Sequence, residues 1–122
     1  MRTITRGLAV GALTLLAAGT AGATTLYTAP ANVQFAGQIM GCRITNVSTT
    51  PRTVKMELRD YAGAVVHSSE TVVSPFATDG TGDSTTGSYC KFVVLDGSST
   101  NVHAAAVYMT SAGLVTTVVP AQ

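Results

Sequence analysis

The chain has 122 residues, of which 46% are hydrophobic and 11% are charged, and its formal net charge is +1. This length allows one domain of ordinary size. The composition excludes a disordered chain, which needs a high net charge and few apolar residues. Seven basic against six acidic side chains also exclude the strongly basic surface that neutralises nucleic-acid phosphates.

The N-terminus has the three parts of a secretory signal peptide. Two arginines come first, then an apolar run over residues 8–19, and then the small-residue pair Ala21-x-Ala23. We predict that residues 1–23 are removed by cleavage near Ala23, and that residues 24–122 form the working domain in the periplasm or outside the cell. A membrane anchor is the alternative, but about 12 apolar residues rise only about 18 Å as a helix, short of the roughly 30 Å hydrocarbon core. We therefore expect no stable membrane span after cleavage.

Both cysteines, Cys42 and Cys90, lie in the predicted working domain. Export would place them where a disulfide forms and persists, and two cysteines allow only one pairing. Such a bridge closes a loop of about 49 residues and destabilises the unfolded chain by about 4 kcal/mol in the chain-entropy model. The alternative is two separate thiols that act as metal ligands or nucleophiles.

The composition of residues 24–122 favours strands. Val, Ile and Thr make up 32 of these 99 residues, against 4 Leu and 2 Glu. Such β-branched side chains prefer the pleated sheet, and no stretch repeats its apolar residues at the helical period. An all-β domain follows.

Alternating or short apolar runs predict seven to eight short strands, and the clearest alternation is Val54, Met56 and Leu58 inward with Lys55, Glu57 and Arg59 outward. We expect Met40, Cys42 and Ile44 to share a face, and likewise Cys90, Phe92 and Val94. In chain order the expected strands cover residues 32–36, 38–46, 52–60, 64–69, 70–74, 89–95, 101–110 and 114–119.

Turns are expected at residues 60–63, at 96–100 as a hairpin, and at 111–113. The glycine-rich segment 77–88 has few apolar side chains and predicts an exposed, mobile loop. Closely spaced short strands predict an immunoglobulin-like β-sandwich in which one disulfide joins the two facing sheets. The absence of Trp excludes a true antibody-type domain.

The chain resembles a known group of proteins in four stretches: CRITN at 42–46, TVKMELRD at 53–60, YCKFV at 89–93 and VHAAA at 102–106. They resemble small exported bacterial proteins that consist of a single immunoglobulin- or fibronectin-like domain with one conserved Cys pair. The resemblance implies the sandwich fold and the bridge. It brings no catalytic residues.

The chain contains the ligand types of a blue-copper centre, namely His67, His103, Cys90 and Met109. The spacing argues against it, since Cys90 and His103 do not share one loop and Cys90 would have to leave its disulfide. We interpret both histidines as ordinary strand residues.

The stretch Asp79-Gly-Thr-Gly-Asp83 suggests a second kind of metal site, a calcium-binding loop. The twelfth position of an EF-hand loop, counted from Asp79, is Cys90 instead of a bidentate Glu, so solvated carboxylates are the better interpretation. No helix pattern follows the glycines to bind a phosphate. We predict no metal and no cofactor.

Residues for catalysis are missing from the pattern. The sequence has no Gly-x-Ser-x-Gly elbow, and Glu57 and Asp60 stand beside Lys55 and Arg59, as on a solvated sheet face. Asn46-Val-Ser48 is an N-glycosylation sequon, which matters only in a host with that machinery. We predict that the protein is not an enzyme.

Two functions fit these observations. The first is an exported domain that acts through its surface on a protein or envelope glycan, with Asp79, Asp83 and Tyr89 at its contact loop. The second is a subunit of a pilus-like or surface assembly formed by strand addition, because the stretch 33–37 ahead of Cys42 is similar to the opening of chaperone-assembled pilins. Against the second, the last strand lacks an aromatic end. The sequence leaves the partner and the oligomeric state open.

Overall fold

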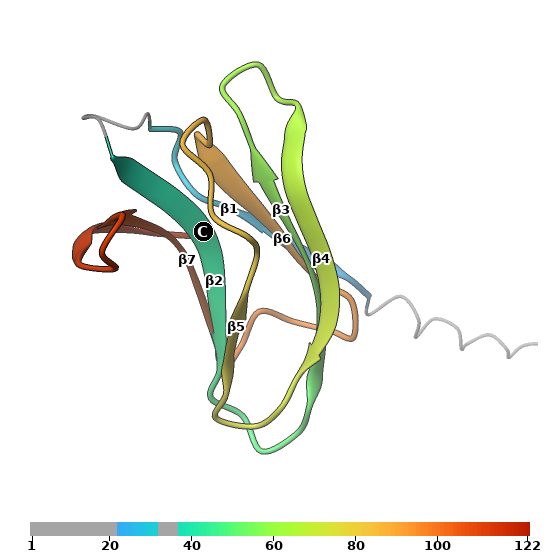
Figure 1. Ribbon diagram of the computed structural model, residues 1–122. Coiled ribbons are helices and arrows are strands. Elements are labelled where there is room, and N and C mark those ends of the chain that lie inside the picture. Colours follow the sequence, from blue (N-terminus) through green and yellow to red (C-terminus); the bar gives the residue numbers. More distant parts are fainter. Residues whose placement is uncertain (1–21, 32–36) are drawn as a thin grey trace, which may run out of the picture.

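Two antiparallel four-stranded sheets pack face to face in the computed structural model, which describes residues 22–31 and 37–122 (Figure 1). Sheet 1 has the order β1-β6-β3-β4, and its strands are β1 (Thr24–Tyr27), β6 (Tyr89–Val94), β3 (Arg52–Arg59) and β4 (Val65–Val73). Sheet 2 has the order β5-β2-β7-β8, and its strands are β5 (Thr78–Gly80), β2 (Gln38–Asn46), β7 (Val102–Thr110) and β8 (Val115–Pro120). The predicted all-β sandwich is confirmed. The described residues include no helix long and apolar enough to cross a membrane.

The inward faces predicted for β2, β3 and β6 are confirmed, because all nine of their alternating residues are buried between the sheets. On β3 the intervening Lys55, Glu57 and Arg59 face outward and are exposed or only partly buried. Strand β7 completes the core from sheet 2. The buried hydrophobic residues are Met40, Cys42, Ile44, Val54, Met56, Leu58, Val73, Cys90, Phe92, Val94, Val102, Ala104, Ala106 and Tyr108.

The disulfide joins Cys42 on β2 to Cys90 on β6, with the two Cα atoms 5.7 Å apart. Both cysteines are fully buried. Strand β2 lies between β5 and β7, and β6 lies between β1 and β3. The bridge therefore joins an inner strand of sheet 1 to an inner strand of sheet 2, as predicted.

Strand β1 takes a place in sheet 1 that the sequence did not indicate. It pairs with β6 from Thr24↔Val94 to Tyr27↔Lys91. In the CFG sheet of an immunoglobulin domain the corresponding neighbour of strand F is the last strand, G. Here the first strand stands beside β6, and the last hairpin, β7–β8, belongs to sheet 2.

Two local predictions are wrong, and one strand boundary differs by a residue. The two strands expected at 64–69 and 70–74 are the single strand β4, which pairs with β3 throughout and absorbs an irregularity at Leu58/Arg59. Residues 96–100 do not form a hairpin turn, since β6 and β7 lie in different sheets. Strand β7 begins one residue later than expected, because Asn101 has a φ of +64°. The strand expected at 32–36 and most of the signal peptide lie outside the described residues.

The segment 77–88 is not the exposed loop that its composition predicted. Its first part is β5, paired with β2, and Ser84 forms a further bridge with Met40 through two backbone hydrogen bonds of 2.9 Å. Thr81 and Ser88 are buried, and the Thr81 hydroxyl accepts the Cys42 N–H at 3.1 Å. The glycines permit this close approach, because a Cβ at Gly87 would lie 2.8 Å from Leu58 Cδ1. The segment covers one edge of sheet 2.

Opening the bridge should strongly destabilise the domain. We expect reduction of the wild type, and the double variant Cys42→Ala/Cys90→Ala, each to lower the free energy of unfolding by about 2–5 kcal/mol, because the open unfolded chain gains entropy. Urea denaturation of the oxidised and reduced wild type and of the variant measures the change. An equal midpoint for oxidised and reduced wild type would show that the bridge contributes nothing.

Candidate binding surface

Three loops lie at one end of the sandwich, which we call the loop end: residues 47–51 between β2 and β3, 74–77 between β4 and β5, and 95–101 between β6 and β7. In Figure 1 the loops 47–51 and 74–77 are at the lower end, and the turn between β3 and β4 is at the upper end. Backbone hydrogen bonds join the loops: Val47 N–H donates to Asn101 C=O at 2.9 Å, and Asn46 N–H donates to Ala77 C=O at 3.0 Å. Loops on a rigid β scaffold are a common place for binding residues.

Asn46, the last residue of β2, holds two of these loops from inside. Its side chain is 0% exposed. Its Nδ2 donates to the carbonyl oxygens of Thr50 at 2.8 Å and Val73 at 3.0 Å, and its Oδ1 accepts from the Ser48 N–H at 2.9 Å and the Ser48 hydroxyl at 2.6 Å. All the polar atoms of this buried amide are thus satisfied, which the interior requires. The sequon nitrogen is therefore inaccessible in the folded domain.

Arg52, the first residue of β3, holds the third loop. Its guanidinium is buried and donates to the carbonyl oxygens of Ser98 and Thr100, the latter at 3.0 Å. Its Nε lies 3.3 Å from Asp96 Oδ1, and the other oxygen of Asp96 accepts the Thr53 N–H at 2.9 Å. A charged group with three oxygen partners gives a more rigid anchor than an exposed ion pair.

Phe76 stands on this rigid base with its ring in solvent. The residue is 70% exposed and has a φ of +61°, a conformation that costs a residue with a side chain about 1–2 kcal/mol. Its N–H is held by the Asn46 C=O at 2.6 Å. Val47 and Leu95, on the other two loops, are also exposed hydrophobic residues. A strained, exposed aromatic residue on an ordered loop is a candidate functional residue.

The three predicted contact residues do not form one site. Asp79 on β5 accepts the Thr71 hydroxyl at 3.1 Å, and Asp83 pairs with Arg43 at 2.8 Å. Tyr89 lies on β6 of the other sheet, opposite Arg59 in the strand register. Both carboxylates are therefore partnered within the protein, and they face different groups. The contact role of these three residues stays a prediction.

The ligand types of a copper site are also spread over the molecule. His67 lies on β4 in sheet 1, where its Nε2 is 3.1 Å from the Asp83 carbonyl oxygen. His103 and Met109 lie on β7 in sheet 2, and the Cys90 sulfur is bonded to Cys42. In the described residues no three His, Cys, Asp or Glu side chains are grouped to hold a metal ion.

The outer face of β3 carries the strongest charge cluster. Glu57 lies between Arg59, whose guanidinium donates at 2.6 Å and 3.0 Å, and Lys55 at 3.6 Å. The hydrogen bond from Arg59 lowers the pKa of Glu57, and the same contact raises the pKa of Arg59. Burial raises the pKa of Tyr108 in the core. The shifts of Glu57 and Arg59 favour the charged forms on the outer sheet face, and the shift of Tyr108 favours the neutral phenol, so all three pKa values move away from neutral pH.

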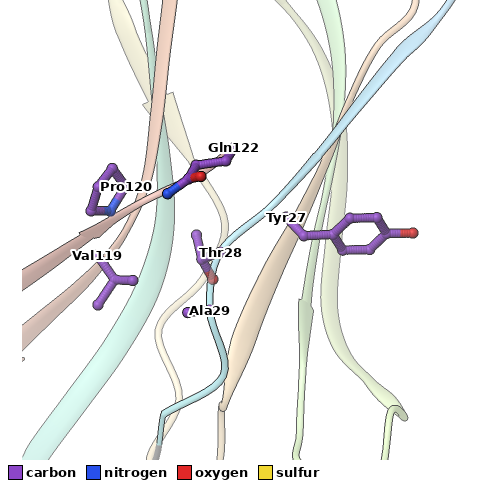
Figure 2. Close-up of a pocket in the computed structure, with 6 residues that line it drawn as sticks. All are labelled: Tyr27, Thr28, Ala29, Val119, Pro120 and Gln122. Carbon is purple, nitrogen blue, oxygen red and sulfur yellow. The ribbon is translucent and has the colours of Figure 1, made fainter.

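A hollow of about 340 Å³ lies between the end of β1 and the end of β8 (Figure 2). It is lined by Tyr27, Thr28, Ala29, Val119, Pro120 and Gln122. Figure 2 shows the Tyr27 ring turned away from the other five residues. None of these six side chains is a carboxylate, an imidazole or a thiol.

Comparisons with known proteins give no further guide. No protein-family model, curated protein or solved structure matches the chain.

The residues that build the loop end were missed from the sequence. The sequence marks Asn46 as part of a sequon, but Asn-x-Ser-x-Thr is also the pattern of an Asx turn followed by hydroxyl capping. The sequence pattern around Arg52 predicts only the start of a strand. The conformation of Phe76 has no local signal, since the left-handed region is rare for a bulky residue.

Glycine at position 76 should fit the backbone better than alanine. Both substitutions remove the ring, but only alanine keeps the cost of a positive φ. We therefore expect Phe76→Gly to exceed Phe76→Ala by about 1 kcal/mol in free energy of unfolding. Thermal and urea denaturation of the two variants measure the difference. If Phe76→Ala is equally or more stable, the backbone at Phe76 is not strained.

Proposed function

We propose that this chain is an exported β-sandwich domain that acts without catalysis, as a binding or structural accessory at the bacterial cell envelope or outside the cell. In this proposal it belongs with the small exported immunoglobulin- or fibronectin-like proteins that its sequence resembles. The observation that carries the proposal is the loop end, where Asn46 and Arg52 order three loops and Phe76 is presented to solvent. An ordered surface loses little entropy on binding.

Export is supported by two features. A buried disulfide is typical of proteins that fold in an oxidising compartment. The first strand, β1, begins at Thr24, the residue after the predicted cleavage site. We therefore propose that the protein is located in the periplasm or in the medium.

The loop end is a better contact surface than the predicted segment 77–88. Arg43 neutralises Asp83, and Asp79 is hydrogen-bonded to Thr71. By contrast, the Phe76 N–H is bonded to the Asn46 C=O, and the residue is 70% exposed. The proposed partner is a protein or an envelope glycan that packs on the Phe76 ring, because both offer apolar surface to an aromatic face.

A second candidate function is a subunit of a pilus-like or surface assembly formed by strand addition. The observation that favours it is that β8, an outermost strand of sheet 2, carries no charged residue. Strand addition needs such an edge.

Export is tested by expressing the full chain in a bacterial host and sequencing the N-terminus of the product in each fraction. We expect a product that begins at Thr24, in the periplasm or medium, with no free thiol. A product that begins at Met1 and stays in the cytoplasm would contradict the proposed location.

The contact surface is tested by comparing two exposed aromatic residues at opposite ends of the sandwich. Phe76 is at the loop end, and Tyr61, 84% exposed, lies in the turn between β3 and β4. The immobilised, oxidised protein is used to capture envelope proteins and glycan fragments. We expect Phe76→Ala to weaken capture at least about tenfold, because an aromatic anchor carries much of the binding free energy. The control Tyr61→Ala should capture as the wild type does.

Equal capture by the wild type and both variants would remove the loop end from the proposal. Phe76→Gly distinguishes binding from stability, since it should be the more stable of the two position-76 variants and still lose capture.

A further inference from the structure

Four strands form the outer edges of the sandwich, and three of them are blocked against pairing. Strand β1 ends in contact with the C-terminus, where Tyr27 and Gln122 exchange two backbone hydrogen bonds of 3.0 Å. Strand β5 has only three residues. Strand β4 carries His67 and Glu70, and two copies of a strand with a carboxylate at its centre repel each other.

In the described part of the chain, strand β8 has none of these protections over most of its length. Leu114, Val115 and Val118 are exposed hydrophobic residues on it or just before it. No Asp, Glu, Lys or Arg occurs from residue 97 to the C-terminus. In Figure 1 the red turn between β7 and β8 projects away from the rest of the sandwich. A charge-free apolar edge strand is the type of edge that pairs with another chain.

The register of β8 shows which backbone groups face outward. Ala121 N–H donates to Ala104 C=O at 2.9 Å, so Ala121 faces β7, and the alternation of an antiparallel strand turns Pro120 and Val118 to the free side. Pro120 has no N–H. Val118 therefore presents its N–H and C=O outward. The C-terminal end of β8 is already paired with β1, and its N-terminal end pairs irregularly with β7, at the register shift between Tyr108 and Met109.

We infer that β8 pairs antiparallel with β8 of a second copy of this chain, across a two-fold axis near Val118, so that two copies of sheet 2 form one continuous sheet. The charge distribution identifies the occupant. A two-fold axis places like residues near like, which a neutral strand tolerates and a charged one does not. A charged partner would find no opposite charge on β8 to pair with.

The pairing is closed. Each copy contributes the same edge, so no second β8 edge remains to extend the sheet, and the protected β1, β4 and β5 edges do not continue it. The inference therefore predicts a dimer, and it differs from the open assembly of the second candidate function. It is also independent of the loop end, because Phe76 lies on the loop that enters β5, the strand at the other margin of sheet 2.

The test uses the full chain exported into an oxidising compartment and measures its molar mass in solution by light scattering over a range of concentrations. Val118→Pro removes the outward N–H and leaves the β7–β8 hydrogen bonds intact, because the pair Val107↔Val118 lies between hydrogen-bonded pairs. Val118→Lys, at a residue 55% exposed, places two ammonium groups near the axis. The matched control is Val72→Lys on the edge strand β4, at a residue 61% exposed.

We expect the wild type and Val72→Lys to have twice the mass of one chain and both Val118 variants to have the mass of one. If Val118→Pro fails to fold, as judged by circular dichroism, Val118→Lys decides alone. A wild type that stays at the mass of one chain at every concentration overturns the inference. Masses that grow beyond two chains, Val118 variants that stay dimeric, or dissociation of Val72→Lys also overturn it.

Discussion

The bridge between Cys42 and Cys90 determines how the rest of the structure is arranged, because it joins inner strands of the two sheets at a fully buried point. Among the described residues, the buried core around it has two aromatic residues, Phe92 and Tyr108, and small alanines at 104 and 106. A small core stabilises a domain of this length only weakly. The bridge also positions the loop end, since Asn46 follows Cys42 by four residues along β2 and Val94 follows Cys90 by four along β6. Fixing two points on facing strands thus fixes the ends from which the loops leave.

Buried polar side chains then order what the bridge has positioned. An apolar residue in place of Asn46 would take this donor from the buried carbonyl oxygen of Val73, and a buried acceptor without a partner costs about 1–3 kcal/mol. Arg52 does the same for the loop that follows β6. With the N–H of Phe76 held by Asn46, the positive φ is kept although it is unfavourable. The same contacts that stabilise the loops therefore keep an aromatic ring in solvent.

The sequence predicts the parts of this fold that depend on alternation. Strands β2, β3 and β6 were placed within a residue because each has one apolar and one polar face, and the disulfide followed from a count of two cysteines. Strand β4 appeared as two strands because its polar stretch around Glu70 lies at a sheet edge, where little is buried. The segment 77–88 was missed because backbone hydrogen bonds and glycine contacts hold it, and neither changes hydropathy. The loop end was invisible for a related reason: residues 46, 76 and 101 meet only after both sheets have formed.

The charges explain how this sandwich manages its edges. All the Asp, Glu, Lys and Arg residues of the described part lie between Arg43 and Asp96, so sheet 1 and the β5 side of sheet 2 carry them, and β7 and β8 have none. A protein with one neutral, apolar edge strand is exposed to uncontrolled pairing unless something limits it. Here Pro120, the irregularity at Met109 and the contact between Gln122 and Tyr27 shorten the free edge to a few residues around Val118. An edge that is unprotected only at its centre and closed at both ends suits one short partner strand, and the strand that matches its length and its lack of charge is its own copy.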